Sequence, residues 1–209
     1  PDPRGPRPPP HRDGADLLRT RSQRFITNAG VAATYIVTAV TDRNADSGKI
    51  SAFIVEAGTP GFSIGRMEEK MGLHASNTGE LLFDGCRIPA DNLLGEEGDG
   101  DRLFLKTLDG GRIGIGAMAL GLAQAAYEAA SSYAKQREQF GRPIAAFQGV
   151  AFKIADMATQ IDAARMMVYR AAWLKDQGQP YSTGAAMAKL FDSEVERKVT
   201  NDEVQVHGG

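Results

Sequence analysis

The 209-residue chain has one cysteine, one tryptophan and only three histidines. A lone cysteine, Cys86, excludes a disulfide within the chain and fits a reducing compartment. We interpret Cys86 as a small buried side chain rather than a nucleophile. His74 stands in a polar loop with no second ligand nearby, so we predict no metal site.

Neither sign of charge predominates, with 24 Lys and Arg against 26 Asp and Glu. This balance argues against nucleic acid as a partner. The longest uncharged helical run, Ile113–Tyr127, is shorter than the ~20 residues needed to cross a bilayer and is rich in Gly and Ala. We therefore predict no membrane span, and we interpret this run as a buried core helix of a soluble protein. No signal peptide is visible, so we expect a protein that is not secreted.

The N-terminal segment is unlike the remainder, because residues 1–10 hold six of the ten prolines. Such a segment cannot sustain a helix or a central strand, so we predict that residues 1–23 are disordered or divergent. Six arginines against three aspartates within residues 1–24 also permit an anion-binding arm. We favour a solvated tail.

Residues 24–98 carry strand signals, namely short β-branched and aromatic runs separated by turn residues. The expected strands are Thr34–Thr41, Ile50–Glu56, Phe62–Gly65, Glu80–Phe83 and Cys86–Ile88. The expected turns are Asp46-Ser47-Gly48, Thr59-Pro60-Gly61 and the tight pair Asp84-Gly85. This spacing predicts a small antiparallel β-barrel or sandwich.

Residues 99–209 carry helix signals. We predict helices over about 101–136 and 146–177, and a third that Ser182 or Thr183 caps. Apolar residues at three- and four-residue spacing form the expected buried stripe of each helix. The stripe of the second helix is Val150, Ile154, Met157, Ile161, Ala164, Val168 and Ala171. The stripe of the third helix is Met187, Leu190, Phe191, Val195 and Val199. Gly110 and Gly111 call for a closely approaching backbone or ligand. The fold class is therefore α+β, a β-domain followed by an incomplete up-down helical bundle.

The loop KQREQFGRPIAAFQ at Lys135–Gln148 joins the first two predicted helices. Residue types alone favour a simple turn. The alternative is a cofactor loop, in which Arg137 and Arg142 offer planar donors for phosphate and Phe140 offers a ring face. The residues themselves indicate no reaction, because the sequence shows no metal-ligand cluster and no Ser-His-Asp or Cys-His arrangement, and no phosphate-binding glycine loop follows a predicted strand.

Seven short motifs occur in order between about Arg24 and Gly209. They are FITNA at 25–29, AFIVE at 52–56, TPGF at 59–62, LLGE at 93–96, LDGGR at 108–112, REQFG at 137–141 and QVHGG at 205–209. Each motif alone is weak, but their order and spacing are highly specific. On these motifs the chain resembles the acyl-CoA dehydrogenase family, especially its short-chain, butyryl-type branch.

The resemblance implies FAD, a homotetramer, and a middle β-domain followed by a helical bundle. It places Phe25, Ile26 and Thr27 at the flavin ring, with Phe25 where the family often has Trp. It implies that the loop at Lys135–Gln148 reaches across a subunit interface and contacts the partner's FAD. It also implies that the backbone at the end of the chain forms a cradle that binds the other end of FAD. The loop residues are Arg137, Gln139, Phe140, Ile144, Phe147 and Gln148, and the cradle is Gln205, Val206, His207, Gly208 and Gly209. Asp109 and Arg112 would lie near the acyl-CoA.

The resemblance implies α,β-dehydrogenation of an acyl-CoA thioester, with electrons passed to an electron-transferring flavoprotein. The family's catalytic glutamate is expected beyond Gly209 in the short-chain branch, and Gly111 holds its position in the isovaleryl branch. We therefore expect no catalytic residue in this chain and no activity from the 209 residues alone. The alternatives are a non-catalytic oligomerising or flavin-binding module and an acyl-CoA oxidase-like member. The expected location is the cytoplasm of a bacterium or the mitochondrial matrix of a eukaryote.

Overall fold

The computed structural model describes residues 11–13, 16–42 and 49–209. The chain divides into two compact units, Pro1–Leu105 and Lys106–Gly209. The proline-rich residues 1–10 and the predicted turn Asp46-Ser47-Gly48 lie outside the described residues.

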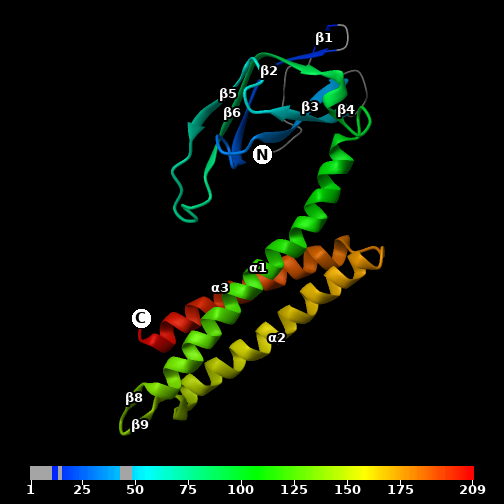
Figure 1. The fold of residues 1–209 in the computed structure, drawn as a ribbon. Helices are drawn as coiled ribbons and strands as arrows, with labels where there is room; N and C mark the ends of the chain where they lie inside the picture. Colours follow the sequence, from blue (N-terminus) through cyan, green and yellow to red (C-terminus); the bar gives the residue numbers. More distant parts are fainter. Residues whose placement is uncertain (1–10, 14–15, 43–48) are drawn as a thin grey trace. The chain divides into compact units, whose positions relative to one another are not determined.

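The first unit contains two antiparallel sheets (Figure 1). One sheet has the order β1 (His11–Asp13), β2 (Asp16–Thr27), β6 (Thr78–Pro89) and β5 (Phe62–Met67). The other has the order β3 (Thr34–Asp42), β4 (Lys49–Glu56) and β7 (Leu93–Leu94), and a short 3₁₀ helix, η1 (Ala90–Asn92), precedes β7. Strand β2 thus begins ahead of the domain boundary predicted at residue 24.

The two sheets share one core, to which Val37 and Phe53 contribute from β3 and β4, and Leu81 and Ile88 from β6. Cys86 is fully buried in this core, as predicted. Inward-facing side chains from two sheets are the arrangement of a sandwich. The predicted antiparallel sandwich is therefore confirmed, and the described strands do not close into a barrel.

The predicted tight turn at Asp84-Gly85 is wrong, because β6 runs unbroken from Thr78 to Pro89. The residues on both sides of the pair align with the same strand, Phe83 with Arg21 and Cys86 with Arg19. A hairpin would instead require the two flanking segments to pair with each other. The register shift at this point and the φ of +58° at Gly85 identify a β-bulge.

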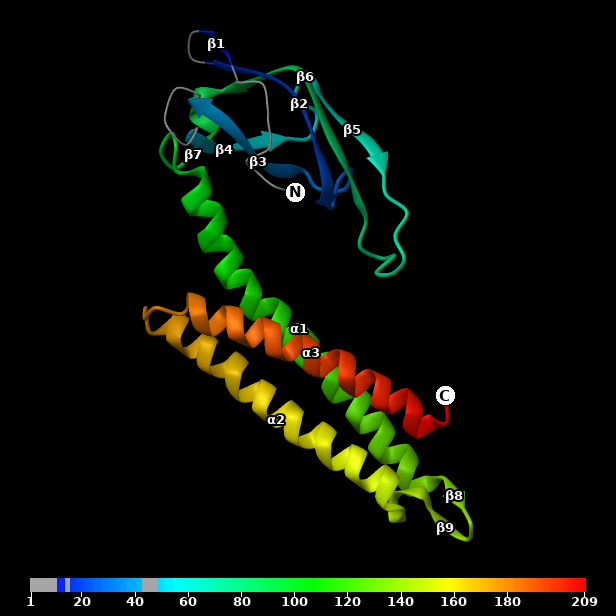
Figure 2. The ribbon, with the colours of Figure 1, turned by 180° about the vertical axis from the view of Figure 1, so that it is seen from behind.

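The second unit contains most of α1 (Gly100–Gln136) and all of α2 (Gln148–Asp176) and α3 (Ser182–His207) (Figure 2). The three predicted helices are confirmed, with boundaries shifted by a few residues at most. The α2 stripe is also confirmed, since Met157, Ile161, Ala164, Val168 and Ala171 are all buried. Alanines from α1 pack with it in a common core.

The predicted stripe of α3 is wrong in its first half, because Met187, Leu190 and Phe191 are exposed. The buried positions there are Ala185, Ala188 and Asp192, followed by Val195, Val199 and Val206. Both sets have helical spacing, so the period alone could not choose between them. The predicted cap at Ser182 or Thr183 is also wrong, because Tyr181 is the N-cap residue and no side chain caps this helix.

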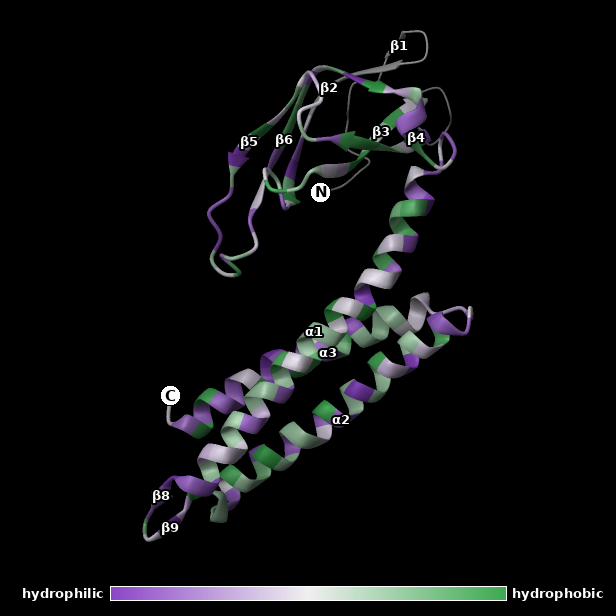
Figure 3. Ribbon diagram, in the orientation of Figure 1, coloured by the Kyte–Doolittle hydropathy of each residue, from purple (hydrophilic) through white to green (hydrophobic). Residues whose placement is uncertain are grey.

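Helix α1 is buried along one stripe only, which includes Ala119, Ala123, Ala130 and Ala134. Ile115, Met118 and Leu122 are exposed in this chain, so the predicted buried core helix is buried on one side only. Hydrophobic residues recur along the length of α1 (Figure 3), and it is long and apolar enough to cross a membrane by length and composition. Core helices of soluble proteins pass the same test.

Gly110 and Gly111 do not have the backbone neighbour that the sequence suggested. A Cβ atom at Gly110 would meet only the Lys175 Nζ, at 3.5 Å, and one at Gly111 would meet nothing within 4 Å. Two glycines of α1 do have close neighbours: a Cβ at Gly100 would lie 2.7 Å from the Ile50 carbonyl oxygen, and one at Gly116 would lie 3.1 Å from an Asp192 carboxylate oxygen.

Candidate functional site

The loop after α1 has a defined backbone rather than a loose turn. Strand β8 (Glu138–Gln139) pairs with β9 (Arg142–Pro143), and the 3₁₀ helix η2 (Ile144–Ala146) leads into α2. The Arg137 N–H donates to the Tyr133 carbonyl at 2.8 Å, and the Ile144 N–H donates to the Arg137 carbonyl at 2.8 Å. These bonds join the ends of the loop and fix where it leaves the bundle.

Phe140 and Gly141 form the tip of this hairpin, with φ values of +51° and +76°. Two-residue hairpin turns of this kind favour Asn-Gly, because a bulky residue at positive φ is strained. Phe140 is nevertheless placed there with 93% of its surface exposed. Strained residues that the surrounding structure holds in place are concentrated at functional sites, so this ring is a candidate ligand contact.

The other predicted loop residues divide into two groups. Arg137, Gln139 and Gln148 are exposed, and no hydrogen bond or ion pair ties the Arg137 guanidinium to another described residue. Ile144 and Phe147 are partly buried and support the loop. The Arg142 guanidinium lies 4.2 Å above the Phe147 ring, and Phe140 meets the same ring edge-on at 6.2 Å. The Arg142 side chain is therefore held in place by Phe147, whereas the Arg137 side chain is available to bind a ligand.

The end of α3 lies at the same end of the bundle as this loop (Figure 1). The His207 ring stacks on Tyr133 of α1, with centroids 4.3 Å apart, and its Nδ1 lies 3.1 Å from a Glu203 carboxylate oxygen. Gly208 adopts the left-handed conformation that ends a helix, and the Gly209 N–H donates to the Val204 carbonyl at 3.0 Å. Tyr133 thus connects the two predicted segments, a contact that sequence reasoning missed.

The predicted cradle residues are not equivalent. Val206 is buried in the bundle core, so its side chain cannot contact a ligand. Gln205 and His207 are exposed. The stacking of His207 depends on Tyr133, 74 positions earlier in the chain, and no local pattern could have revealed it.

A second candidate surface lies in the first unit, at Phe25–Thr27 near the end of β2. The pairing of β2 with β6 is shifted between Gln23 and Ile26, and Phe25 at this break has a φ of +57°. Phe25 is 61% exposed, whereas Ile26 packs against the core of the sandwich. The irregularity turns an aromatic ring outward at the position where sequence reasoning expected a flavin contact.

Both units match models of one family. Residues 13–86 match the acyl-CoA dehydrogenase middle domain, and residues 98–209 match the acyl-CoA dehydrogenase C-terminal domain. The chain belongs to the acyl-CoA dehydrogenase family.

Among curated relatives, the short-chain specific acyl-CoA dehydrogenase of Megasphaera elsdenii is 52% identical over 188 residues, which are 90% of this chain and 49% of that protein. A solved structure described as the electron transferring flavoprotein of Acidaminococcus fermentans is 53% identical, with a TM-score of 0.89, and covers 94% of this chain and 52% of that one. A structure of PigA with FAD and proline is 35% identical, with a TM-score of 0.87, over 92% of this chain and 50% of that one. The chain thus spans about half the length of the relatives it matches.

Asp109 and Arg112, the predicted acyl-CoA contacts, make bonds within the helical unit. The Arg112 guanidinium lies 2.5 Å from one Asp109 oxygen, and the Ser182 hydroxyl donates to the other. These contacts join α1 to the beginning of α3. The role of the pair at the substrate stays a prediction.

The described residues include no group of three His, Cys, Asp or Glu side chains that could hold a metal ion. His74 Nε2 lies 2.8 Å from the Lys70 carbonyl, and His207 is engaged by Glu203 and Tyr133. The candidate residues fit FAD better than they fit a metal ion. The exposed Arg137 suits a phosphate, and the exposed rings of Phe25 and Phe140 suit a ring system. The end of α3, with its glycines, suits a polar chain.

Proposed function

We propose that the chain is part of an FAD-dependent, short-chain acyl-CoA dehydrogenase. Such an enzyme removes one hydrogen from each of the α- and β-carbons of a fatty acyl-CoA thioester. The match of both units to this family carries the proposal. It is supported by the chemistry of the loop after α1, where Phe140 is held outward in a strained backbone conformation.

In this proposal the side chains of the loop act on the cofactor of a neighbouring subunit within a homotetramer. Arg137 pairs with the pyrophosphate, while Gln139 and Phe140 contact the rest of the cofactor. Ile144, Phe147 and Gln148 continue the surface, and the backbone of Gln205–Gly209 receives the other end of FAD. In the first unit, Phe25 and Ile26 lie against the flavin ring and Thr27 donates a hydrogen bond to it.

When bound, FAD would supply the acceptor for the hydride of the β-carbon, and a glutamate base of the whole enzyme would take the proton of the α-carbon. Asp109 and Arg112 lie near the acyl-CoA in the proposed complex. An electron-transferring flavoprotein then removes the electrons, and the A. fermentans structure supports this partner by its description. The proposed location is the bacterial cytoplasm or the mitochondrial matrix.

Arg137→Ala tests the proposed cofactor site. A charge-assisted hydrogen bond contributes about 1.5–3 kcal/mol, so the apparent FAD affinity should fall roughly 10- to 100-fold. Flavin content after purification and titration with FAD would measure this loss. The thermal midpoint without FAD should change little, because the Arg137 guanidinium forms no hydrogen bond, ion pair or ring contact with another described residue.

Arg197→Ala is the matched control, because Arg197 is also an exposed arginine of the helical unit and, among the described residues, pairs only with Glu194, at 3.0 Å. It should retain flavin at the wild-type level. If Arg137→Ala lowered the stability without FAD as much as it lowered flavin content, the loop would be structural and this assignment would fail.

Two rival functions predict different results. A non-catalytic oligomerising module would purify colourless and would take up no FAD. An acyl-CoA oxidase-like enzyme would consume oxygen with acyl-CoA, whereas a dehydrogenase would reduce an electron-transferring flavoprotein instead.

A further inference from the structure

The centre of α3 carries a carboxyl group that the proposed function does not use. The side chain of Asp192 is 0% exposed, and neither of its oxygens has a hydrogen-bond partner among the described residues. Ser51 in the other unit shows the usual arrangement of a buried polar group, since its hydroxyl bonds Thr41 and the Gly98 N–H. A buried polar group without a hydrogen-bond partner raises the free energy of the folded state, so the burial of Asp192 calls for an explanation.

The carboxyl of Asp192 lies against the backbone of α1. A Cβ atom added at Gly116 would be 3.1 Å from Asp192 Oδ2 and 3.4 Å from Val168 Cγ2 of α2. Cβ atoms at Gly111, Gly114 and Gly121 of the same helix would meet nothing within 4 Å. Gly116 is therefore the position on α1 at which a missing side chain makes room for the acid.

No charged group of the neighbouring helices neutralises Asp192. One turn from Gly116 on α1, Arg112 is paired with Asp109, and one turn from Val168 on α2, Arg165 bonds Asp162 and Gln124. Burial raises the pKa of Asp192 from its ordinary value of 3.8 to about 6.

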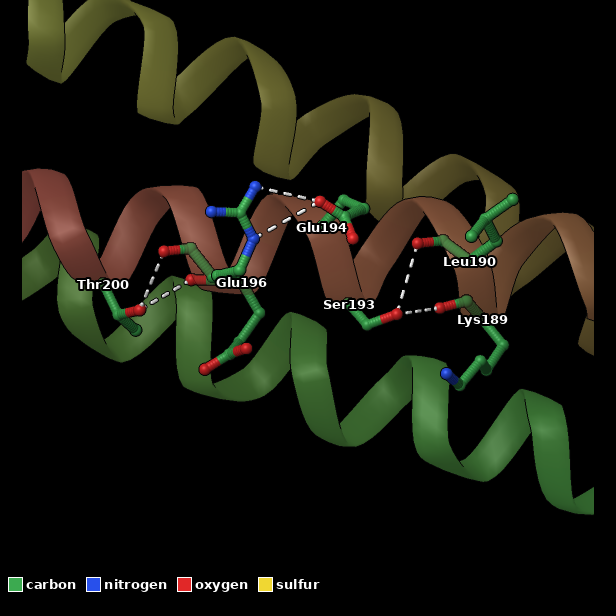
Figure 4. Close-up of polar contacts among 7 residues, drawn as sticks. Lys189, Leu190, Ser193, Glu194, Glu196 and Thr200 are labelled. Carbon is green, nitrogen blue, oxygen red and sulfur yellow. Dashed lines mark hydrogen bonds and ion pairs between the residues drawn. The ribbon is translucent and has the colours of Figure 1, made fainter.

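The polar neighbours along α3 itself are also engaged elsewhere or lie a turn away. Figure 4 shows the Ser193 hydroxyl bonded to the Lys189 and Leu190 carbonyls, and Glu194 paired with an arginine on the same helix. Lys189 and Glu196 stand about one turn before and after Asp192. Neither forms a hydrogen bond or ion pair with the Asp192 carboxylate.

We propose that Asp192 and Gly116 form a proton-operated joint of the helical unit, at which α1 and α3 pack tightly while the carboxyl is protonated and separate when it is ionised. The inference does not rest on the proposed function, because no cofactor or substrate enters it. The folded state binds the proton more strongly than the open state. The stabilisation is therefore complete below the ordinary pKa of 3.8 and is lost as the pH rises through about 6.

Hydrogen exchange in the 209-residue chain tests the joint. Between about pH 5 and pH 7, protection of the amides around Gly116 and Asp192 should fall about tenfold after correction for intrinsic exchange. Asp192→Asn keeps the shape and cannot ionise, so its protection should not depend on pH. Asp156→Asn, which removes an exposed acid on α2, should retain the wild-type dependence. An identical pH dependence in wild type and Asp192→Asn would overturn the proposal.

A second pair of variants tests the contact itself. Gly116→Ala should lower the thermal midpoint of the wild type but not that of Asp192→Ala, because the acid is the group that the new methyl meets. Gly111→Ala, with open space around it, should lower neither. Equal losses from Gly116→Ala in both backgrounds would contradict the joint.

Carbon-13 NMR of the wild-type carboxyl provides a measurement that needs no variant to fold. A titration midpoint near 6 supports the proposal, and a midpoint at the ordinary value of 3.8 overturns it.

Discussion

The two units bury different kinds of side chain. The core of the β-unit is built from large residues, among which Phe53, Leu81 and Ile88 are almost fully buried. The core of the helical unit contains eight buried alanines, with Met157, Ile161 and four valines among them. The buried alanines are Ala119, Ala123, Ala130, Ala134, Ala164, Ala171, Ala185 and Ala188.

This difference indicates how each unit responds to a change in side-chain volume. Sheets in a sandwich are about 10 Å apart, so large side chains must fill the space between them. Helices whose contact faces carry alanine can approach more closely, which leaves little room for added atoms. The β-unit should therefore be most sensitive to lost volume, and the helical unit to added volume.

Phe53→Ala should give the largest effect, because it empties the centre of the sandwich. We expect the free energy of unfolding of the β-unit to fall by about 3–5 kcal/mol. Hydrogen exchange at increasing urea concentration would follow each unit separately. Ile36→Ala is the control, since Ile36 on β3 is exposed, and its loss should be much smaller. Equal losses would show that the sandwich core does not determine stability.

Ala164→Leu tests the opposite sensitivity in the helical unit. Ala164 is fully buried, so the added atoms should destabilise the bundle by about 1–3 kcal/mol. Ala163→Leu places the same side chain at the adjacent, exposed position and should be nearly neutral. Urea unfolding of both variants would measure the difference. A neutral Ala164→Leu would mean that the bundle core has unused space.

The smallest expected effect concerns Asp202 of α3, which has two charged partners, whereas Asp192 has none within the described part of the chain. Its oxygens lie 3.1 Å from Lys153 of α2 and 2.7 Å from Lys198. Partial burial acts to raise the pKa of Asp202, but the hydrogen bonds from Lys198 and Lys153 outweigh it and hold the pKa below 3.8. Asp202→Asn should cost about 1 kcal/mol at neutral pH.

The pH dependence of this effect has the opposite sign to that of Asp192. A depressed pKa stabilises the folded state fully above 3.8, and the stabilisation is lost as the pH falls through the lower folded value. The stability difference between wild type and Asp202→Asn, measured by urea unfolding, should therefore disappear in strong acid. Glu194→Gln, which breaks an exposed pair, should show almost no difference at any pH. A difference for Asp202→Asn that persisted in acid would rule out the ion pairs as its cause.

The positions of the helices and strands could be predicted from the sequence better than which side of each one is buried. The second helix was placed with the correct stripe because Ile, Met and Val mark its buried side. The third was assigned the wrong side in its first half, because Met187, Leu190 and Phe191 are more apolar than the alanines that are buried. The sequence also suggested a turn at Asp84-Gly85, where long-range pairing with β2 imposes a bulge instead.

The candidate site was predictable only in part. The motifs located the two surfaces, but the hairpin after α1 and the left-handed conformation of Phe140 arise from backbone pairing. The Tyr133–His207 stack joins residues far apart in the chain. Asp192 was missed because an isolated acid in a helix is usually on its solvated face.

The position of β6 in the sheet also affects the order in which the chain can fold during synthesis. Strand β2 pairs with β6, about 60 residues later, so at roughly 5–20 residues per second it waits ~3–12 s for its partner. The β3–β4 hairpin needs only local closure and can form within microseconds of leaving the ribosome. Three arginines within the sequence of β2, Arg19, Arg21 and Arg24, keep the waiting strand charged. Charge of this kind opposes pairing with other nascent chains during the delay.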